Sequence, residues 1–278
     1  MDYIIRNMNP EEMDFAVSLA AEEGWNPGKN DGAVFYTTDP NGFFVGELNG
    51  EIIACKSAVR YGDKFGFMGF YIVKKEFRGK NFGLQLWKHA FDRLKDIPSG
   101  MDGVVAQQAN YAKSGYVLAY RQLRYEGQNI TEKPSFKLSE LSDISLDELI
   151  KYDETIFPAP RPEFLKLWLN QPGISVKVSV NESKITGYGV IRPCRVGYKI
   201  GPLFAESSSI AENIFLSLAE FAYGKEIYLD VPESNTQAVE LVKKYNMRYV
   251  FETARMYNNG RPKDNPQKVF GVTTFELG

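Results

Sequence analysis

The most constraining feature of this 278-residue sequence is that one succession of predicted strands and helices occurs twice. In the first half, a hairpin that turns at Asn49-Gly50 leads into an apolar strand over residues 65–73 and then into an amphipathic helix. In the second half, a hairpin over residues 174–196 leads into a strand over 198–204 and again into an amphipathic helix. The repetition predicts an α/β (α+β) protein with two tandem, related domains, each a mixed, mostly antiparallel sheet flanked by helices.

A polar segment separates the two halves. Residues 128–143 are rich in Asn, Thr, Glu, Lys, Pro and Ser, and they predict a linker between a first domain of residues 1–127 and a second of residues 144–278. The last predicted strand, over residues 268–277, has no clear counterpart at the end of the first domain. The two domains therefore share one closing strand, and the sequence leaves open whether it crosses over to complete the first sheet.

Charge, cysteine and hydropathy patterns disfavour several classes of protein. Lys+Arg of 33 and Asp+Glu of 35 give a net charge of −2, without the basic stripe of a nucleic-acid-binding protein. No apolar run is long enough to span a bilayer, and the N-terminus lacks the pattern of a secretory signal. Cys55 and Cys194 form neither a metal-binding nor a disulfide pattern. We therefore expect a cytoplasmic protein that binds neither nucleic acid nor membrane.

His89 is the only histidine in the sequence, and it falls in the middle of a predicted helix. Zinc sites built from several imidazoles are thereby excluded, and a Ser-His-Asp triad would have to use this one residue. We expect no metal, and we interpret His89 as a structural or surface residue.

The segment Arg78–Gly83 lies between the apolar strand and the amphipathic helix of the first half. The first N–H groups of a helix have no internal partner, and the helix dipole favours negative charge there. A diphosphate is the natural guest of such a loop, with Arg78 and Lys80 adding side-chain charge and the glycines admitting phosphate close to the backbone. The loop alone is weak evidence, because Arg-Gly-Lys before a helix is also an ordinary turn.

Tyr111 supplies a second signal, in the segment Tyr111-Ala112-Lys113-Ser114-Gly115-Tyr116. Together with the loop it resembles the GNAT N-acetyltransferase superfamily, whose phosphate loop has the pattern Arg/Gln-x-x-Gly-x-Gly/Ala and whose tyrosine opens a Tyr-x-x-x-Gly-Phe-like segment. Asn81 stands where the family most often has its first glycine, and Asn tolerates the left-handed backbone of such a turn. The wider chain resembles bacterial tandem-GNAT proteins with a degenerate GNAT-like C-terminal domain, on residues 39–44, 201–203, 229–232 and 271–278.

The resemblance implies acetyl-CoA as the acyl donor. The strand backbone at residues 72–73 would pair with the pantetheine arm, and the thioester would lie between that strand and one predicted over 103–108. A strand N–H near Tyr71 or Ile72 would face the developing oxyanion, and Tyr111 would protonate the departing thiolate. The residues implied to contact the donor are Tyr71, Ile72, Val73, Arg78, Gly79, Lys80, Asn81, Phe82, Gly83, Leu84 and Asn110.

The implied activity is transfer of an acetyl group from acetyl-CoA to a primary amine of a small molecule, by direct attack in a ternary complex. Ordinary pKa values support the role of Tyr111: an alkyl thiol titrates near ~8.5 and a phenol near ~10, so the tyrosine is still protonated when the thiolate appears. Two alternatives stay open: an acyltransferase that uses another acyl chain or acceptor, and a non-catalytic acyl-CoA sensor in which Tyr111 only packs. Either a monomer or a homodimer fits the sequence.

The sequence does not identify the group that takes the proton of the amine. Asp31 and Glu47 are the candidate carboxylates, although a solvated charge is the commoner role of such residues. Two glutamines near the expected acetyl site are candidates for orienting the acceptor, and two aromatic residues are candidates for lining its cleft, with core packing as the alternative. The candidate substrate-contacting residues are Asp31, Tyr36, Glu47, Phe70, Gln107 and Gln108.

The second domain lacks the residues that make the first a candidate enzyme. Val242 stands at the place of the catalytic tyrosine and cannot donate a proton. Glu206 lies at the start of the corresponding helix, where no Arg-Gly loop occurs, and it would repel a diphosphate. We predict a degenerate domain that shapes the substrate site or buries the open face of the first domain.

Overall fold

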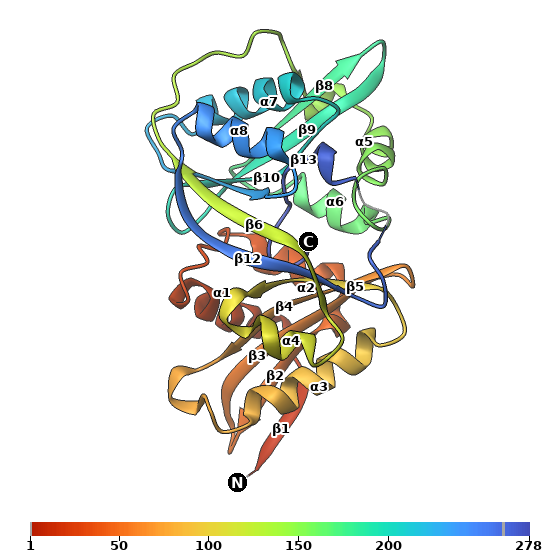
Figure 1. The fold of residues 1–278 in the computed structure, drawn as a ribbon, viewed down its shortest axis with the longest axis vertical. Helices are drawn as coiled ribbons and strands as arrows, with labels where there is room; N and C mark the ends of the chain where they lie inside the picture. The colour runs from red at the N-terminus through yellow and green to blue at the C-terminus, as the bar shows by residue number, and fades with distance from the viewer. Residues whose placement is uncertain (1, 263–264) are drawn as a thin grey trace.

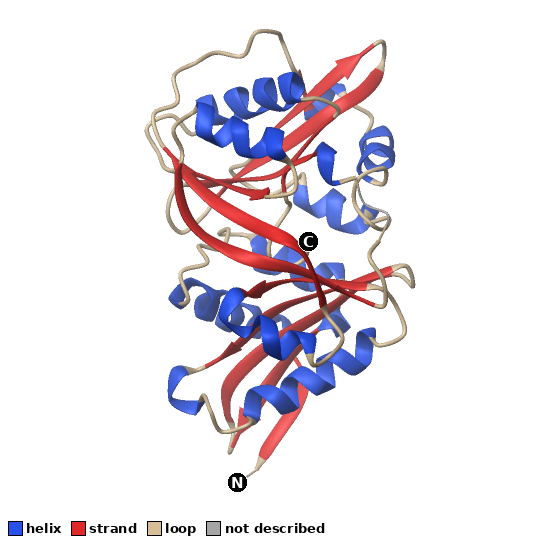
Figure 2. Cartoon of the chain, in the orientation of Figure 1, coloured by secondary structure: helices blue, strands red, loops and turns tan. Residues whose placement is uncertain are grey.

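The computed structural model, which describes residues 2–262 and 265–278, shows that the two halves share one continuous sheet (Figure 1). Helices pack on both faces of the sheet in each half (Figure 2). The predicted fold class, two related α/β halves with mixed sheets flanked by helices, is confirmed.

Local signals explain most elements of the N-terminal half. Asn49 and Gly50 both have positive φ, 50° and 85°, as a type I′ hairpin turn requires. The strands are β1 (Tyr3–Asn7), β2 (Phe43–Leu48), β3 (Glu51–Tyr61), β4 (Phe65–Val73), β5 (Ser99–Val104) and β6 (Val117–Gly127). The α-helices are α1 (Met13–Glu22), α2 (Asp31–Thr38), α3 (Phe82–Leu94) and α4 (Gln108–Ala112).

The C-terminal half repeats this order, and its two helices on one face of the sheet carry side-chain caps. Ser207 accepts a hydrogen bond from the backbone of Ile210, and Asn235 accepts one from Ala238. The strands are β7 (Ser139–Glu140), β8 (Ser175–Asn181), β9 (Lys184–Pro193), β10 (Tyr198–Ala205), β11 (Ile227–Pro232), β12 (Arg248–Asn258) and β13 (Val269–Gly271). The α-helices are α5 (Leu146–Asp153), α6 (Pro162–Trp168), α7 (Ser208–Phe221) and α8 (Thr236–Lys244).

The two halves exchange strands, as the strand order β1-β2-β3-β4-β5-β12-β6-β11-β10-β9-β8-β7 shows, with β13 paired to β10. β12 pairs antiparallel with both β5 and β6, and β6 pairs on its other edge with β11, so the two long strands pass between the halves (Figure 1). The strand that completes the N-terminal sheet is therefore β12, not the last predicted strand over 268–277. β12 has 11 residues, enough to span β5 and continue along β6, whereas β13 has 3 and stays beside β10.

Two predictions in the N-terminal half are incomplete or displaced. The helix α2 has no counterpart among the predicted elements, although its Val34 and Phe35 are buried in the core. The strand predicted over 103–108 is instead β5, which begins at Ser99. Pairing with β4 and β12, more than local propensity, sets the limits of this Gly-containing strand.

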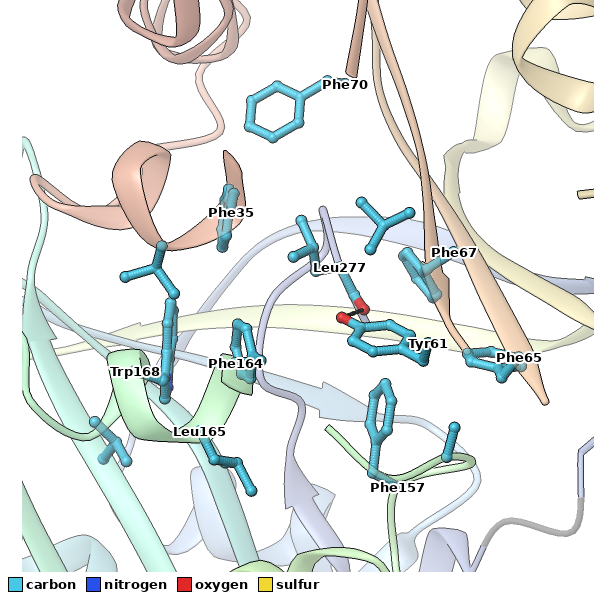
Figure 3. Packing of buried hydrophobic residues seen from close by; sticks show 14 of the residues in the cluster. Phe35, Tyr61, Phe65, Phe67, Phe70, Phe157, Phe164, Leu165, Trp168 and Leu277 are labelled. Carbon is cyan, nitrogen blue, oxygen red and sulfur yellow. Dashed lines mark hydrogen bonds between the residues drawn. The ribbon is translucent and has the colours of Figure 1, made fainter. Parts of the chain in front are cut away.

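An aromatic core joins the halves between α2 and α6 (Figure 3). Phe35 stacks on Trp168 with ring centroids 6.1 Å apart, and Phe157 packs edge-on against Tyr61 at 5.0 Å. The Tyr61 hydroxyl donates a hydrogen bond to the carbonyl oxygen of Leu277 at 2.9 Å. This packing holds the segment around Leu277 between the two halves, next to the site described below.

Candidate active site

The sheet opens between β4 and β5. The two strands pair in parallel at three positions, the last being Met68–Met101, and within the described residues no further pair follows. A bulge in β4 accompanies the divergence, since Phe70 and Tyr71 together face Lys56 of β3. Phe70 has a φ of 45°, a strained conformation for a phenylalanine that is typical of functional sites.

Two adjoining cavities occupy the opening. The outer cavity, of about 520 Å³, lies beside the Arg78–Gly83 loop and the start of α3. The inner cavity, of about 510 Å³, lies between β4 and β5. The residues common to both walls are Glu23, Trp25, Tyr71, Val104 and Tyr111. A long ligand that enters the outer cavity can therefore present its end to the inner one.

The outer cavity has the features of an anion site. Gly79 and Asn81 adopt left-handed φ values of 76° and 68°, and Asn81 directly precedes α3. A Cβ atom at Gly79 would meet only open space, so a ligand can approach the backbone there, and the first N–H groups of α3 favour negative charge. The predicted donor-binding residues that line this cavity are Tyr71, Ile72, Val73, Arg78, Gly79, Asn81, Gly83 and Leu84.

The side chain of Arg78 connects the loop to the end of α1. Its Nη2 lies 2.5 Å from Glu23 Oε1, and its Nε donates to the carbonyl oxygen of Val73 at 2.8 Å. The Arg78 side chain is 44% exposed. Because an exposed ion pair is only weakly stabilising, a phosphate group can replace Glu23 as the partner of Arg78 at little cost.

Tyr111 lies where the two cavities meet. Its ring stacks on Trp87 of α3 with centroids 5.2 Å apart, and Trp87 donates from Nε1 to Ser114 Oγ at 2.9 Å. Gly103 of β5 leaves room for the phenol, because a Cβ atom there would overlap its ring. Burial raises the pKa of Tyr111, while a hydrogen bond from the backbone of Val104 lowers it by less, so the hydroxyl stays protonated at neutral pH. A general acid needs this protonation state.

The C-terminal half supplies one wall of the inner cavity. Arg124 lies 4.8 Å from the ring centroids of both Phe251 and Phe275, and its Nη1 donates to the carbonyl oxygen of Trp25 at 2.6 Å. The same guanidinium is buried in an ion pair with Asp230. The second half thus shapes the cavity beside Tyr111, one of the two roles predicted for it. The wall residues that it provides are Tyr249, Phe251, Glu252, Thr253 and Phe275.

Three residues implied to contact the donor do not line either cavity. The Phe82 side chain belongs to the core, with its ring centroid 4.7 Å from that of Tyr3. Lys80 extends over Phe77, with Nζ 5.5 Å from the ring centroid. Asn110 forms hydrogen bonds with neighbouring side chains of its own turn. The Phe82 side chain is buried, so any contact of Phe82 with the donor would use its backbone, whereas the Lys80 side chain is exposed beside the loop.

The two carboxylates suggested from the sequence as proton acceptors lie away from both cavities. Asp31 is 1% exposed, and its Oδ1 is 2.9 Å from Nε of Arg192 in β9. Glu47 pairs with Arg6 at 3.0 Å on the outer strands of the sheet. Each carboxylate is paired with an arginine outside the cavities, which argues against Asp31 or Glu47 as the acceptor of the amine proton.

The remaining acceptor candidates divide between the cavities and the surrounding structure. Phe70 lines the inner cavity and Gln107 the outer one. Tyr36 donates its hydroxyl to a backbone carbonyl of the core, and Gln108 accepts a hydrogen bond from Arg121. The bulge explains why Phe70 reaches the cavity, whereas Tyr36 packs beside it.

Sequence reasoning missed four charged residues that line the inner cavity: Glu23, Lys56, Asp102 and Glu252. Burial lowers the pKa of Lys56 to about 7. A lysine between the apolar residues 52–55 and 58–59 of β3 is the signal that the sequence offers at this position. Glu252 gave no such signal, because its place in the wall depends on the pairing of β12 with β5.

Comparisons with known proteins agree with this geometry. The model of the acetyltransferase (GNAT) family matches residues 11–116, and that of an acetyltransferase (GNAT) domain matches residues 149–271. The holothin acyltransferase of Pseudoalteromonas sp. (strain SANK 73390) is 32% identical over 270 residues, which cover 96% of this chain and 92% of that protein. The chain belongs to the GNAT acetyltransferase family. Both halves are GNAT domains, so the tandem arrangement inferred from the sequence is confirmed.

Solved GNAT structures share the fold at lower identity. A putative acetyltransferase from Pyrococcus horikoshii superposes with a TM-score of 0.85 at 22% identity, covering 99% of this chain and 96% of that one. A tandem GNAT protein from the clavulanic acid biosynthesis pathway gives a TM-score of 0.64 at 10% identity, covering 95% and 100%. Solved structures therefore share the overall fold along nearly the whole chain.

GNAT enzymes use acyl-CoA, and the outer cavity of this GNAT chain fits that donor at the open backbone of Gly79. Among the residues that the structure describes, no group of three or more His, Cys, Asp or Glu side chains is arranged to hold a metal ion. In the same part of the chain, no helix is both long and apolar enough to cross a membrane.

Proposed function

We propose that this GNAT protein is an acyl-CoA-dependent N-acyltransferase that transfers an acyl group, acetyl in the simplest case, to a primary amine of a small molecule. The observation that carries the proposal is the position of Tyr111, where the outer and inner cavities meet. A thioester at this junction would direct its sulfur toward the phenol and its carbonyl toward the bulge in β4.

The reaction would proceed by direct attack in a ternary complex. The amine nitrogen attacks the carbonyl carbon of the thioester, and the oxyanion forms beside the strand N–H groups near Tyr71 and Ile72. The C–S bond then breaks, and Tyr111 gives its proton to the departing thiolate. The nitrogen loses one proton and the phenol regains one from solvent, so the products are the amide and free coenzyme A.

Glu252 is the carboxylate best placed to receive the proton of the amine. Among the other carboxylates of the inner cavity, Asp102 accepts two hydrogen bonds from Arg255 at 2.7 and 2.6 Å, and Glu23 is held by the loop arginine. Glu252 has a longer ion pair with Arg121 at 3.7 Å, and its side chain is 35% exposed. Its other oxygen, Oε2, accepts a long hydrogen bond from the Tyr249 hydroxyl at 3.4 Å, so Glu252 is the least tightly held of the three.

The relative named holothin acyltransferase favours acyl transfer over acyl-CoA sensing. An inner cavity of about 510 Å³ with walls from both halves favours a small acceptor over a protein tail. We also expect a cytoplasmic monomer or homodimer that binds neither nucleic acid nor membrane.

Incubating the protein with acetyl-CoA and a panel of amines tests the proposal, and a second incubation replaces the panel with a metabolite extract. Release of free thiol should depend on the amine, and mass spectrometry should find the acylated product. Absence of heat on titration with coenzyme A thioesters would contradict the proposal. Binding without turnover by any acceptor would instead favour the sensor.

A further inference from the structure

The amine of Lys56 lies in the wall of the inner cavity and does not line the outer one. Its Nζ donates to the carbonyl oxygens of Ser57 at 3.1 Å and Gly69 at 3.0 Å. It also lies 5.1 Å from the ring centroid of Trp87 and 5.6 Å from that of Tyr71. When protonated, the amine has three N–H donors, so one N–H then remains beyond these two hydrogen bonds.

Lys56 differs from the other buried cations in lacking a carboxylate neighbour. The buried cationic side chains of residues 2–262 and 265–278 are Lys56, Arg124, Arg161, Arg192, Lys199 and Arg255. Each of the arginines forms an ion pair with an aspartate. The charges of Asp230 and Glu276 act on Lys199 and favour its protonated form. The Cys55 thiol is the ionisable group that acts on Lys56. Two carbonyl oxygens and two aromatic rings contact this amine, but no described carboxylate forms an ion pair with it, so burial disfavours its charged form. A ligand that brings an anion to the amine would restore that form.

The duplicated architecture shows that this position does not require a lysine. Lys56 faces the bulge in β4, and the residue that faces the corresponding bulge in β10 is Val190. Val190 is fully buried and apolar. The fold therefore accepts an apolar side chain at this position. The amine of Lys56 is thus not required for folding, which favours a role in the inner cavity of the N-terminal half.

Of the parts of the donor, the acyl group is the one that can reach Lys56. Lys56 shares the inner cavity with Met68 and Met101, the last residue pair before β4 and β5 diverge. Trp87 is the common neighbour of Lys56 and Tyr111. The diphosphate belongs to the outer cavity and the sulfur to the junction, so an anion that the donor brings to Lys56 belongs to the far end of its acyl chain.

We propose that Lys56 selects donors whose short acyl chain ends in a carboxylate, such as malonyl-CoA or succinyl-CoA. This refinement rests on the proposed function. The carboxylate accepts a hydrogen bond from the remaining N–H of the ammonium group. The two methionines pack against the methylene groups of the chain. A neutral branched chain of the same shape would place hydrocarbon against the amine and leave it without a partner.

Titration calorimetry with matched thioesters tests this assignment without knowledge of the acceptor. Isovaleryl-CoA has the shape of malonyl-CoA but carries two methyl groups in place of the carboxylate oxygens. The wild-type protein should bind malonyl-CoA about 30-fold more tightly than isovaleryl-CoA. Lys56→Met should abolish or reverse this preference, and Lys56→Gln should weaken it. Lys88→Met removes an exposed lysine from α3 and should change neither affinity.

The outcomes separate this inference from the proposed function. Equal or tighter binding of isovaleryl-CoA by the wild-type protein overturns the inference and leaves an N-acyltransferase. A folded Lys56→Met or Lys56→Gln variant that keeps the full preference overturns it as well. If neither thioester nor coenzyme A itself binds, the proposed function fails. Should Lys56→Met not fold by circular dichroism, Lys56→Gln and the wild-type comparison decide.

Discussion

In both halves the sheet opens between two parallel strands, but one opening holds a cavity and the other is filled by the chain. In the N-terminal half, β4 and β5 pair at three positions and then diverge around the inner cavity. In the C-terminal half, β10 and β11 also pair at three positions and then diverge. There β13 pairs with β10, and Val272 donates its N–H to Asp230 of β11 at 2.9 Å. The second opening is thus filled by the chain itself, where an open GNAT half would receive pantetheine.

The filling segment continues into the first half. The carbonyl oxygen of Thr273 closely approaches Gly201 of β10, and that of Glu276 closely approaches Gly69 of β4. Between them, Phe275 lines the inner cavity. A GNAT half can therefore lose its ligand site without losing its fold, and the segment that closes one opening helps to shape the other.

Donor binding should show the largest difference between the halves. Calorimetry should give one equivalent of acyl-CoA per chain, and Gly79→Asp should weaken binding by more than about 100-fold, because it puts a negative charge in the anion site. Gly224→Asp is the matched control in the closed half, since both glycines have φ values near 80° and open space at Cβ. Binding of two equivalents of acyl-CoA with similar affinity would contradict this difference between the halves.

Catalysis should depend on Tyr111 of the open half. Tyr111→Phe should lower turnover about 10²-fold with little change in acyl-CoA affinity, because only proton transfer to the thiolate is lost. Tyr116→Phe removes another buried hydroxyl, one that bonds Ser99 Oγ at 2.8 Å outside both cavities, and should leave turnover intact. Steady-state thiol release measures both, and unchanged turnover in Tyr111→Phe would remove this residue from the mechanism.

The two glycines that meet the shared segment should respond alike in stability and differently in activity. Gly69→Ala and Gly201→Ala should each lower the free energy of unfolding by about 2 kcal/mol, because the new Cβ collides with a backbone carbonyl. Only Gly69→Ala should also reduce turnover, since Gly69 lines the inner cavity. Urea unfolding and thiol release give the two readouts, and equal activity loss in both variants would contradict this view.

Left-handed asparagines offer a smaller, paired test. Asn81 before α3 and Asn246 after α8 have φ values of 68° and 52°. Replacing either by Ala should cost about 1 kcal/mol of stability. Asn81→Ala should in addition weaken acyl-CoA binding several-fold, measured by calorimetry, and Asn246→Ala should not.

We expect the smallest effect from alkaline pH acting on Tyr111, the proposed general acid. Burial raises the pKa of Tyr111 above its ordinary value near ~10, so the phenol keeps its proton well above neutral pH. The ratio of wild-type to Tyr111→Phe turnover should therefore stay constant between about pH 7 and pH 9. A ratio that falls over this range would mean that the phenol ionises early.

Features that neighbouring residues determine could be predicted from the sequence. The Asn49-Gly50 turn, the loop at Arg78–Gly83 and the helix stripe of α3 are patterns of this kind, and they were sufficient to suggest the donor cavity and Tyr111. Gly79 and Asn81 carry the backbone conformations that such a loop needs.

Features that depend on distant pairing could not be predicted. β5 meets β12 across more than half of the chain, so the wall with Phe251 and Glu252 had no local signature. The sequence offers Asp31 as a candidate carboxylate, but only the folded chain brings Arg192 against it. Lys56 is visible in the sequence as a charge next to the apolar residues of β3, but only the structure shows that no described carboxylate pairs with it.

The exchange of β12 has a consequence for synthesis on the ribosome. β5 is complete once residue 104 has emerged, but its antiparallel partner is not available until translation has passed residue 258. Throughout this interval the nascent N-terminal half presents an unpaired sheet edge, which is a template for association with other chains. Cells that make this protein must therefore protect that edge or translate the remainder quickly.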